Sequence, residues 1–172
     1  MQSQVYPWRR YWARLFDITF IMPFYIFIIS LFSPGLNYTI TRMENFIGGT
    51  LLLLFYLIFF EPTMLSSFGT TPGKVLLGIK IRALSGEKIS YTTGMKRGFL
   101  VWIYGMGIGI PFIALFTMII AYNKLKRNGV TGWDEKCGIS VLHDQLSIFR
   151  VILFITLFIF CLFIWVGFVS NF

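Results

Sequence analysis

Two stretches of this 172-residue chain, residues 51–60 and 151–169, contain no charged side chain at all. Hydrocarbon offers the backbone no hydrogen-bond partner, so segments of this kind form helices inside a membrane or lie in the core of a large protein. The chain is too short to enclose several such helices in a water-soluble shell. We therefore expect an all-α membrane protein.

The charge balance supports a membrane setting rather than a nucleic-acid partner. Fifteen Lys and Arg against seven Asp and Glu give a formal net charge of +8. In a soluble protein this excess would suggest nucleic acid, but the cytoplasmic loops of membrane proteins also collect Lys and Arg. We expect the lipid bilayer and its anionic phospholipid headgroups as partners, and no nucleic acid.

The apolar regions are four in number, at about residues 11–32, 46–60, 99–122 and 148–169. Ser33-Pro34-Gly35 closes the first, and the second is expected to stop at Glu61-Pro62. Because about fifteen residues are fewer than the roughly 20 needed to cross a bilayer, the second helix either extends to both sides or sits in a thinned bilayer. Alternating glycines and a proline interrupt the third at residues 105–111. The pattern predicts a bundle of three to four transmembrane helices with a re-entrant or broken third helix. We find no internal repeat.

A polar segment between the second and third apolar regions has the alternation of β-strands. Apolar and basic side chains alternate over residues 79–83, turn residues follow at 85–87, and alternation resumes at 88–91. This pattern predicts a small interfacial β-hairpin.

The distribution of basic residues indicates the topology. The N-terminus and the segment 74–97 are rich in Lys and Arg, whereas the first loop carries only Arg42. A re-entrant third region would also place the basic residues of 124–136 inside, whereas a full crossing would place them outside. The count favours the re-entrant form, with the full crossing as the alternative. We expect a multi-pass protein of the cell membrane, of the bacterial cytoplasmic type, with a cytoplasmic N-terminus.

Charged side chains at the ends of apolar helices are the candidate functional residues, because burying charge in lipid is costly. Arg10, Arg14 and Asp17 are spaced to share one helix face. A structural ion pair between Arg14 and Asp17 is the alternative to a functional role. Glu61, directly before Pro62, is either a further site residue or an interfacial helix cap.

Residues 69–74 (GTTPGK) resemble a phosphate-binding loop but lack its glycine spacing and its final Ser or Thr. A tight turn at Pro72 and Gly73 that presents Lys74 to headgroups is the physical interpretation. His143 and Asp144 have no well-placed nucleophile, and no metal-ligand spacing is present. We therefore expect no catalytic residues, no metal and no cofactor.

Three segments together resemble the RDD family of small multi-pass membrane proteins. They are residues 10–17 (RYWARLFD), residues 69–81 (GTTPGKVLLGIKI), and Asp134 with Gly138 four positions later. The arginine and two aspartates that name the family would be Arg10, Asp17 and Asp134. The resemblance covers about residues 9–142, so we expect an RDD-like membrane domain over 1–145 and an additional transmembrane helix over 146–172.

The resemblance implies transport of an unidentified ligand, with cation/proton antiport proposed for some members. A re-entrant third region would bring one cytoplasmic-side cluster together, composed of Arg10, Arg14, Asp17, Glu61, Lys74 and Asp134. In that cluster Asp17 and Asp134 would alternate between the arginines and a transported cation or proton. The alternative is a non-catalytic scaffold or accessory subunit that binds anionic lipid or a partner protein. The partner would be another membrane protein or a second copy of this chain. Ile139 stands where the family usually has Thr.

Overall fold

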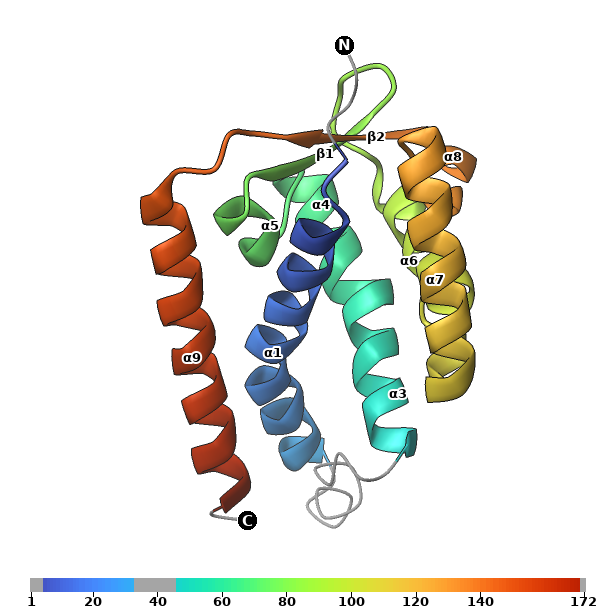
Figure 1. Cartoon of the computed structure of the whole chain (residues 1–172). Helices are drawn as coiled ribbons and strands as arrows, with labels where there is room; N and C mark the ends of the chain where they lie inside the picture. Colours follow the sequence, from blue (N-terminus) through green and yellow to red (C-terminus); the bar gives the residue numbers. More distant parts are fainter. Residues whose placement is uncertain (1–4, 33–45, 171–172) are drawn as a thin grey trace.

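The computed structural model describes residues 5–32 and 46–170 (Figure 1). The predicted turn at Ser33-Pro34-Gly35 and the loop residue Arg42 lie outside these residues. The described part is mostly helical, and three of its helical segments are long and apolar enough to cross a membrane: Pro7–Ile28, Gly48–Ser67 and Ile148–Gly167.

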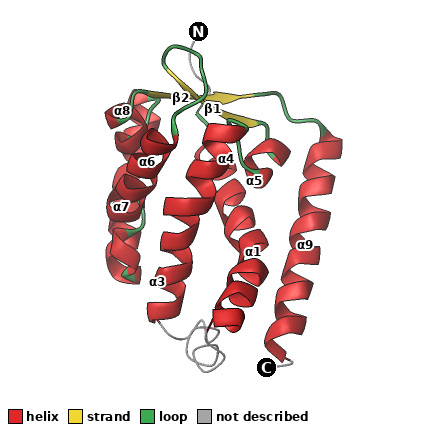
Figure 2. Ribbon diagram, turned by 180° about the vertical axis from the view of Figure 1, so that it is seen from behind, coloured by secondary structure: helices red, strands yellow, loops and turns green. Residues whose placement is uncertain are grey.

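A short two-stranded sheet lies at one end of the molecule, and the long helices extend from that end (Figures 1 and 2). Helix α1 (Pro7–Phe32) leads away from the sheet, and α3 (Phe46–Phe55), the π-helical turn η1 (Tyr56–Phe60) and α4 (Glu61–Ser67) return toward it. The largest apolar core among the described residues lies between these helices and the segment that contains Val101, and it is centred on Tyr56, Leu57 and Val101.

The predicted stop of the second helix at Glu61-Pro62 is wrong, and the helix extends beyond its apolar stretch, which was one of the two outcomes expected for so short a stretch. In η1 the hydrogen bonds run five residues back, so the Glu61 N–H donates to the Tyr56 carbonyl. The following residue, Pro62, has no N–H to lose, and the wider turn makes room for its ring. The helix therefore continues through the proline to Ser67.

Strand β1 (Ile79–Ala83) does not form the predicted local hairpin with residues 88–91. It pairs antiparallel with β2 (Ile139–His143), 60 positions later in the sequence. Residues 88–90 form no strand, and the Ser90 hydroxyl instead caps the next helix by accepting a hydrogen bond from the Thr93 N–H at 3.2 Å. The cap satisfies a helix N–H that would otherwise have no partner.

The third apolar region is broken in the glycine stretch. Helix α6 (Tyr91–Tyr104) runs away from the sheet, the short turn η2 (Gly107–Gly109) reverses the chain, and α7 (Pro111–Asn128) returns. Proline suits the first position of α7, where its missing N–H would have no helical partner. The start of α6 and the end of α7 therefore both lie at the sheet end of the molecule (Figure 2).

An internal repeat, which the sequence analysis did not find, relates residues 69–83 to residues 129–143. Each copy begins with a left-handed glycine at φ 73° (Gly69, Gly129) and continues into a five-residue helix. These helices are α5 (Pro72–Leu76) and α8 (Gly132–Lys136), and a second left-handed glycine and a five-residue strand follow each. The strand register is symmetric about the pair Ile81↔Val141.

Close packing of α6 against the second helix depends on two glycines. A Cβ on Gly94 would lie 3.0 Å from Pro62 Cα, and one on Gly98 would clash with the Leu57 carbonyl oxygen. Small residues four apart let two helix backbones approach closely. The last helix, α9 (Ile148–Ser170), packs more loosely: it contacts α1 through Phe16 and Phe154, and only 6% of its candidate span is buried.

Candidate functional site: a buried charge network

Six ionisable side chains from five helical elements meet at the sheet end of the helices. We call them the charge network: Arg10, Asp17, Glu61, Lys74, Arg97 and Asp134. All are buried except Arg10, whose side chain is 18% exposed. Because a buried charge is stable only when it is paired and hydrogen-bonded, each contact in this network has a structural reason.

Asp17 of α1 is held mainly by α5. Its Oδ1 accepts a hydrogen bond from the Gly73 N–H at 2.6 Å, and its Oδ2 accepts bonds from the hydroxyls of Thr71 and Tyr56. The Lys74 ammonium lies 3.8 Å from Oδ2. The partner expected from the sequence, Arg14, makes no ion pair with Asp17. The α5 backbone takes that place because Gly73 has no Cβ to keep it away from α1.

Glu61 lies between two cations. Its Oε1 accepts hydrogen bonds from Lys74 Nζ at 2.8 Å and from Arg97 Nη1 at 2.9 Å. Its second oxygen, Oε2, is buried and has no hydrogen-bond partner among the described residues. Glu61 is thus the carboxylate of the network that keeps an open acceptor position.

Arg97 joins the two halves of the network. While Nη1 donates to Glu61, Nε donates to Asp134 Oδ1 at 2.8 Å. Arg10 Nη1 and the Thr131 hydroxyl both donate to Asp134 Oδ2, at 2.9 and 2.7 Å. Burial by itself would raise the pKa of Asp134, but Arg97, Arg10 and the Thr131 hydroxyl together bring it below its ordinary value. Asp134 is therefore ionised and has a partner for each oxygen.

Lys74 and Asp134 occupy equivalent positions of the internal repeat. Each is the third residue of its short helix and follows a buried threonine by three positions. Thr131 caps α8, whereas Thr71 donates a hydrogen bond to Asp17 of the charge network. Thr71 Oγ1 lies 3.1 Å from Lys74 Nζ, and Thr131 Oγ1 lies 2.7 Å from Asp134 Oδ2. The repeat thus places opposite charges at matched points, and the network fills the interface between its two halves.

Arg14 lies beside the network without a partner of its own. It is half-buried, and it makes no hydrogen bond or ion pair with any residue that the structure describes. Its charge nevertheless acts on Glu61. The six network residues balance three positive charges against three negative ones, so Arg14 leaves the site with a surplus positive charge.

The sequence matches the model of the RDD family over residues 5–171. The chain belongs to the RDD family. With this membership and three candidate spans, it is a membrane protein. A search of the curated proteins and a search of the solved structures each returned no match.

The RDD match includes α9, the helix that we expected to be an addition to the family domain. The division into residues 1–145 and 146–172 stays a prediction. Arg10, Asp17 and Asp134, which the sequence resemblance assigned to the family's name, all belong to the network. Arg10 and Asp134 form one of its ion pairs.

The sequence analysis missed one residue of the charge network, Arg97. It also missed three hydroxyl residues that donate hydrogen bonds to the network, Tyr56, Thr71 and Thr131. Arg97 stands in a basic segment where orientation charges are expected, so its charge alone gave no signal. Its position between Gly94 and Gly98 was the available indication, because a face of small residues marks close helix contact.

The predicted structural residues of the RDD motif occupy tight backbone positions. Pro72 is the first residue of α5, and Gly73 supplies the N–H that binds Asp17. Gly138 is left-handed at φ 62°, a conformation that favours glycine, and leads into β2. Lys74, expected at the headgroups, is buried in the network instead. Its ammonium lies between the carboxylates of Asp17 and Glu61.

Proposed function

We propose that this RDD protein couples proton movement to the transport of a small anion, with Glu61 as the proton-binding group. The observation that carries the proposal is the open Oε2 of Glu61 between two buried cations. Ionisable groups at membrane depth are costly and are usually kept for function. No catalytic role is assigned to any residue.

Among the described residues Glu61 keeps one carboxylate oxygen without a donor, which the two aspartates that the sequence suggested do not, although two cations hold its other oxygen. Asp17 accepts three hydrogen bonds and Asp134 is bound by Arg97, Arg10 and Thr131. A proton would have to displace these donors. Oε2 of Glu61 has no donor to displace.

The charge balance favours an anion as the second ligand. Protonation of Glu61 would remove one of three negative charges and weaken its hold on Lys74 and Arg97. With Arg14 already unpaired, the site would then carry two surplus positive charges. An anion binds better to the protonated site, and by linkage the proton binds better when the anion is present.

The proposed orientation places the sheet and the charge network at the cytoplasmic side of the cell membrane, with α6 and α7 as a re-entrant pair. This choice is supported by the basic residues that gather at the sheet end, from both the N-terminal segment and the end of α7. In this orientation the rule that cytoplasmic segments are rich in Lys and Arg is satisfied.

Proteoliposomes that contain a pH-sensitive dye test the proposal. Inward gradients of chloride, phosphate or acetate are imposed in turn, and sodium and potassium gradients are imposed separately. We expect proton uptake with at least one anion, a loss of at least tenfold in Glu61→Gln, and no change in Glu87→Gln, whose carboxylate is exposed. Proton movement driven by a cation gradient alone, or none in any arm, contradicts the proposal.

A membrane scaffold or accessory subunit is the second candidate. Helices α7 and α9 expose large apolar side chains such as Phe112, Phe116 and Phe163. Lipid covers such a surface in a membrane, and in this candidate a partner protein or a second copy replaces part of that lipid. This candidate predicts a stable complex after mild solubilisation, with the complex unaffected by Glu61→Gln.

A further inference from the structure

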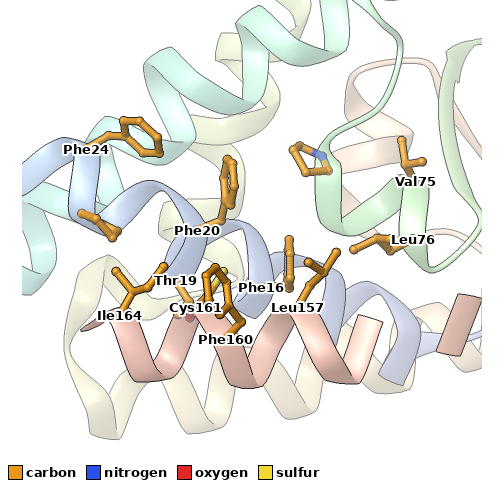
Figure 3. A pocket seen from close by; sticks show the side chains of 12 residues that line it. Phe16, Thr19, Phe20, Phe24, Val75, Leu76, Leu157, Phe160, Cys161 and Ile164 are labelled. Atoms are coloured by element: carbon orange, nitrogen blue, oxygen red, sulfur yellow. The ribbon is translucent and has the colours of Figure 1, made fainter. Parts of the chain in front are cut away.

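An apolar groove runs between α1, α5 and α9, with a volume of about 540 Å³ (Figure 3). Phe16, Phe20 and Phe24 of α1 form one wall, Leu157 and Ile164 of α9 form another, and Val75 of α5 closes one end. The groove lies on the opposite side of α5 from the charge network, and it plays no part in the proposed proton chemistry.

The shape of the groove fits one hydrocarbon chain. The three phenylalanines of its α1 wall are spaced four residues apart, so this wall extends about 12 Å along the helix axis. Such a wall can lie along part of one acyl chain.

The walls give a polar ligand nothing to bind. The Thr19 hydroxyl in the α1 wall is already used, because it donates to the Leu15 carbonyl oxygen at 2.9 Å. Two prolines, Pro23 and Pro72, contribute no N–H to the surface. The groove thus offers apolar contact alone, which is the chemistry that an acyl chain can use.

Arginines stand at one end of the groove on both of its long walls. Arg150 precedes Leu157 by seven residues, and Arg9 precedes Phe16 by seven, so each lies on the helix face that lines the groove. Arg150 Nη1 lies 3.5 Å from where a Cβ on Gly78 would be, beside the end of α5. Arg150 makes no hydrogen bond or ion pair with a residue in the described part of the chain, although its charge acts on Asp144, which is itself paired with Lys80 at 2.9 Å.

We infer that an anionic phospholipid binds here, with one acyl chain in the groove and its phosphate at Arg150. The two halves of the ligand match the two halves of the site, an apolar slot and a guanidinium at its end that donates no hydrogen bond to a described residue. Such a lipid would touch α5 on the face away from Lys74 and Gly73, and so would support the helix that binds Asp17. The inference holds whether or not the protein transports an anion.

Native mass spectrometry of the purified full chain tests lipid binding. Phosphatidylglycerol and phosphatidylcholine with the same acyl chains are added in separate titrations. We expect one tightly retained phosphatidylglycerol, bound several-fold better than phosphatidylcholine. Ile164→Trp, which fills the groove, should reduce retention at least fivefold, whereas Phe163→Trp at the neighbouring position, 72% exposed and outside the groove, should not. Arg150→Gln should abolish the preference for phosphatidylglycerol. Equal retention by the Ile164 and Phe163 variants overturns the inference.

A second measurement leaves the groove wall unchanged. The chain has two cysteines, so Cys137→Ser leaves Cys161 in the groove wall as the single thiol. Phosphatidylglycerol should slow alkylation of Cys161 by a small maleimide in detergent several-fold, and free phosphate at the same concentration should not. An alkylation rate that phosphatidylglycerol does not change, or that free phosphate lowers equally, overturns the inference.

Discussion

Arg97 uses two different nitrogens to hold two different carboxylates, and this determines how the network responds to substitution. Arg97→Gln would leave Glu61 and Asp134 buried with one cation fewer. Removing one partner of a buried ion pair typically costs about 3 to 5 kcal/mol. We expect a loss of that size in the free energy of unfolding, measured by denaturant titration in detergent micelles.

Lys96→Gln is the matched control, because its side chain is the exposed neighbour of Arg97. Its effect should stay within about 0.5 kcal/mol. Arg97→Lys should recover only part of the stability, since a single ammonium cannot replace a planar fork with two separated donors. Equal stability of the Arg97→Gln and Lys96→Gln proteins would show that the network does not hold the fold together.

The pKa of His143, the chain's single histidine, should show that its imidazole is partly buried beside the sheet. Burial lowers its pKa from 6.5 to about 4, with help from the positive charges of Arg10 and Arg9. An NMR titration of its imidazole should therefore give a midpoint near pH 4.

The same shift makes stability depend on pH. Between pH 6.5 and pH 4 the unfolded chain takes up a proton at His143 that the folded chain does not, so folding stability falls as pH drops through this window. His143→Phe should flatten the stability curve there. A midpoint near pH 6.5 would mean that the imidazole is solvated.

At the residue scale, sequence reasoning found the three carboxylates of the network and missed Arg97, which pairs with two of them, Glu61 and Asp134. An acid beside an apolar run stands out because charge is rare there, which is how Asp17 and Glu61 were identified. Arg97 follows Lys96 in a basic segment, and nothing in that segment distinguishes an inward-facing cation from an outward-facing one. Only the three-dimensional contact of α6 with α4 and α8 makes the distinction.

At the scale of elements, the close approach of α5 to α1 requires a residue without a side chain at position 73. A Cβ on Gly73 would clash with the Ala13 carbonyl oxygen and lie 3.0 Å from Asp17 Oδ1. Gly73→Ala should push α5 away from α1, weaken the Gly73–Asp17 hydrogen bond, and cost about 1 to 3 kcal/mol as overpacking does. Denaturant titration measures the loss.

Gly49→Ala in α3 is the comparison, because a Cβ there would meet nothing within 4 Å. Alanine favours helix over glycine by about 1 kcal/mol, so this variant should be as stable as the parent or more stable. If both alanine variants behaved alike, the close approach of α5 to α1 would not matter.

The strand pairing shows where local patterns stop being informative. Residues 79–83 were predicted to be extended, and they are, but alternation at 88–91 suggested a nearby partner. The real partner, β2, lies 60 residues away, because the repeat presents the two strands to each other across a symmetric register. The shared residues, such as Gly78 with Gly138 and Ile79 with Ile139, were visible but too few to indicate a repeat without the backbone geometry.

At the scale of the whole molecule, the contacts between distant segments constrain the topology. Arg10, near the start of α1, pairs with Asp134 just after α7, and β1 pairs with β2. Segments that touch in this way must lie on one side of a membrane. The hairpin of α6 and α7 satisfies that condition, whereas a full crossing would place Asp134 about 30 Å from Arg10.

Cysteine accessibility in sealed vesicles tests this arrangement directly. In a chain with Cys137→Ser and Cys161→Ser, single cysteines are introduced as Asn128→Cys at the end of α7 and Ser85→Cys beside β1. Because the β1–β2 pair ties both segments to the same end of the molecule, a membrane-impermeant maleimide should label both from the same side. The basic residues around them predict that this side is the cytoplasm. Labelling of the two positions from opposite sides would require the β1–β2 pair and the Arg10–Asp134 ion pair to be absent in the membrane, and the charge network could not then exist as a single site.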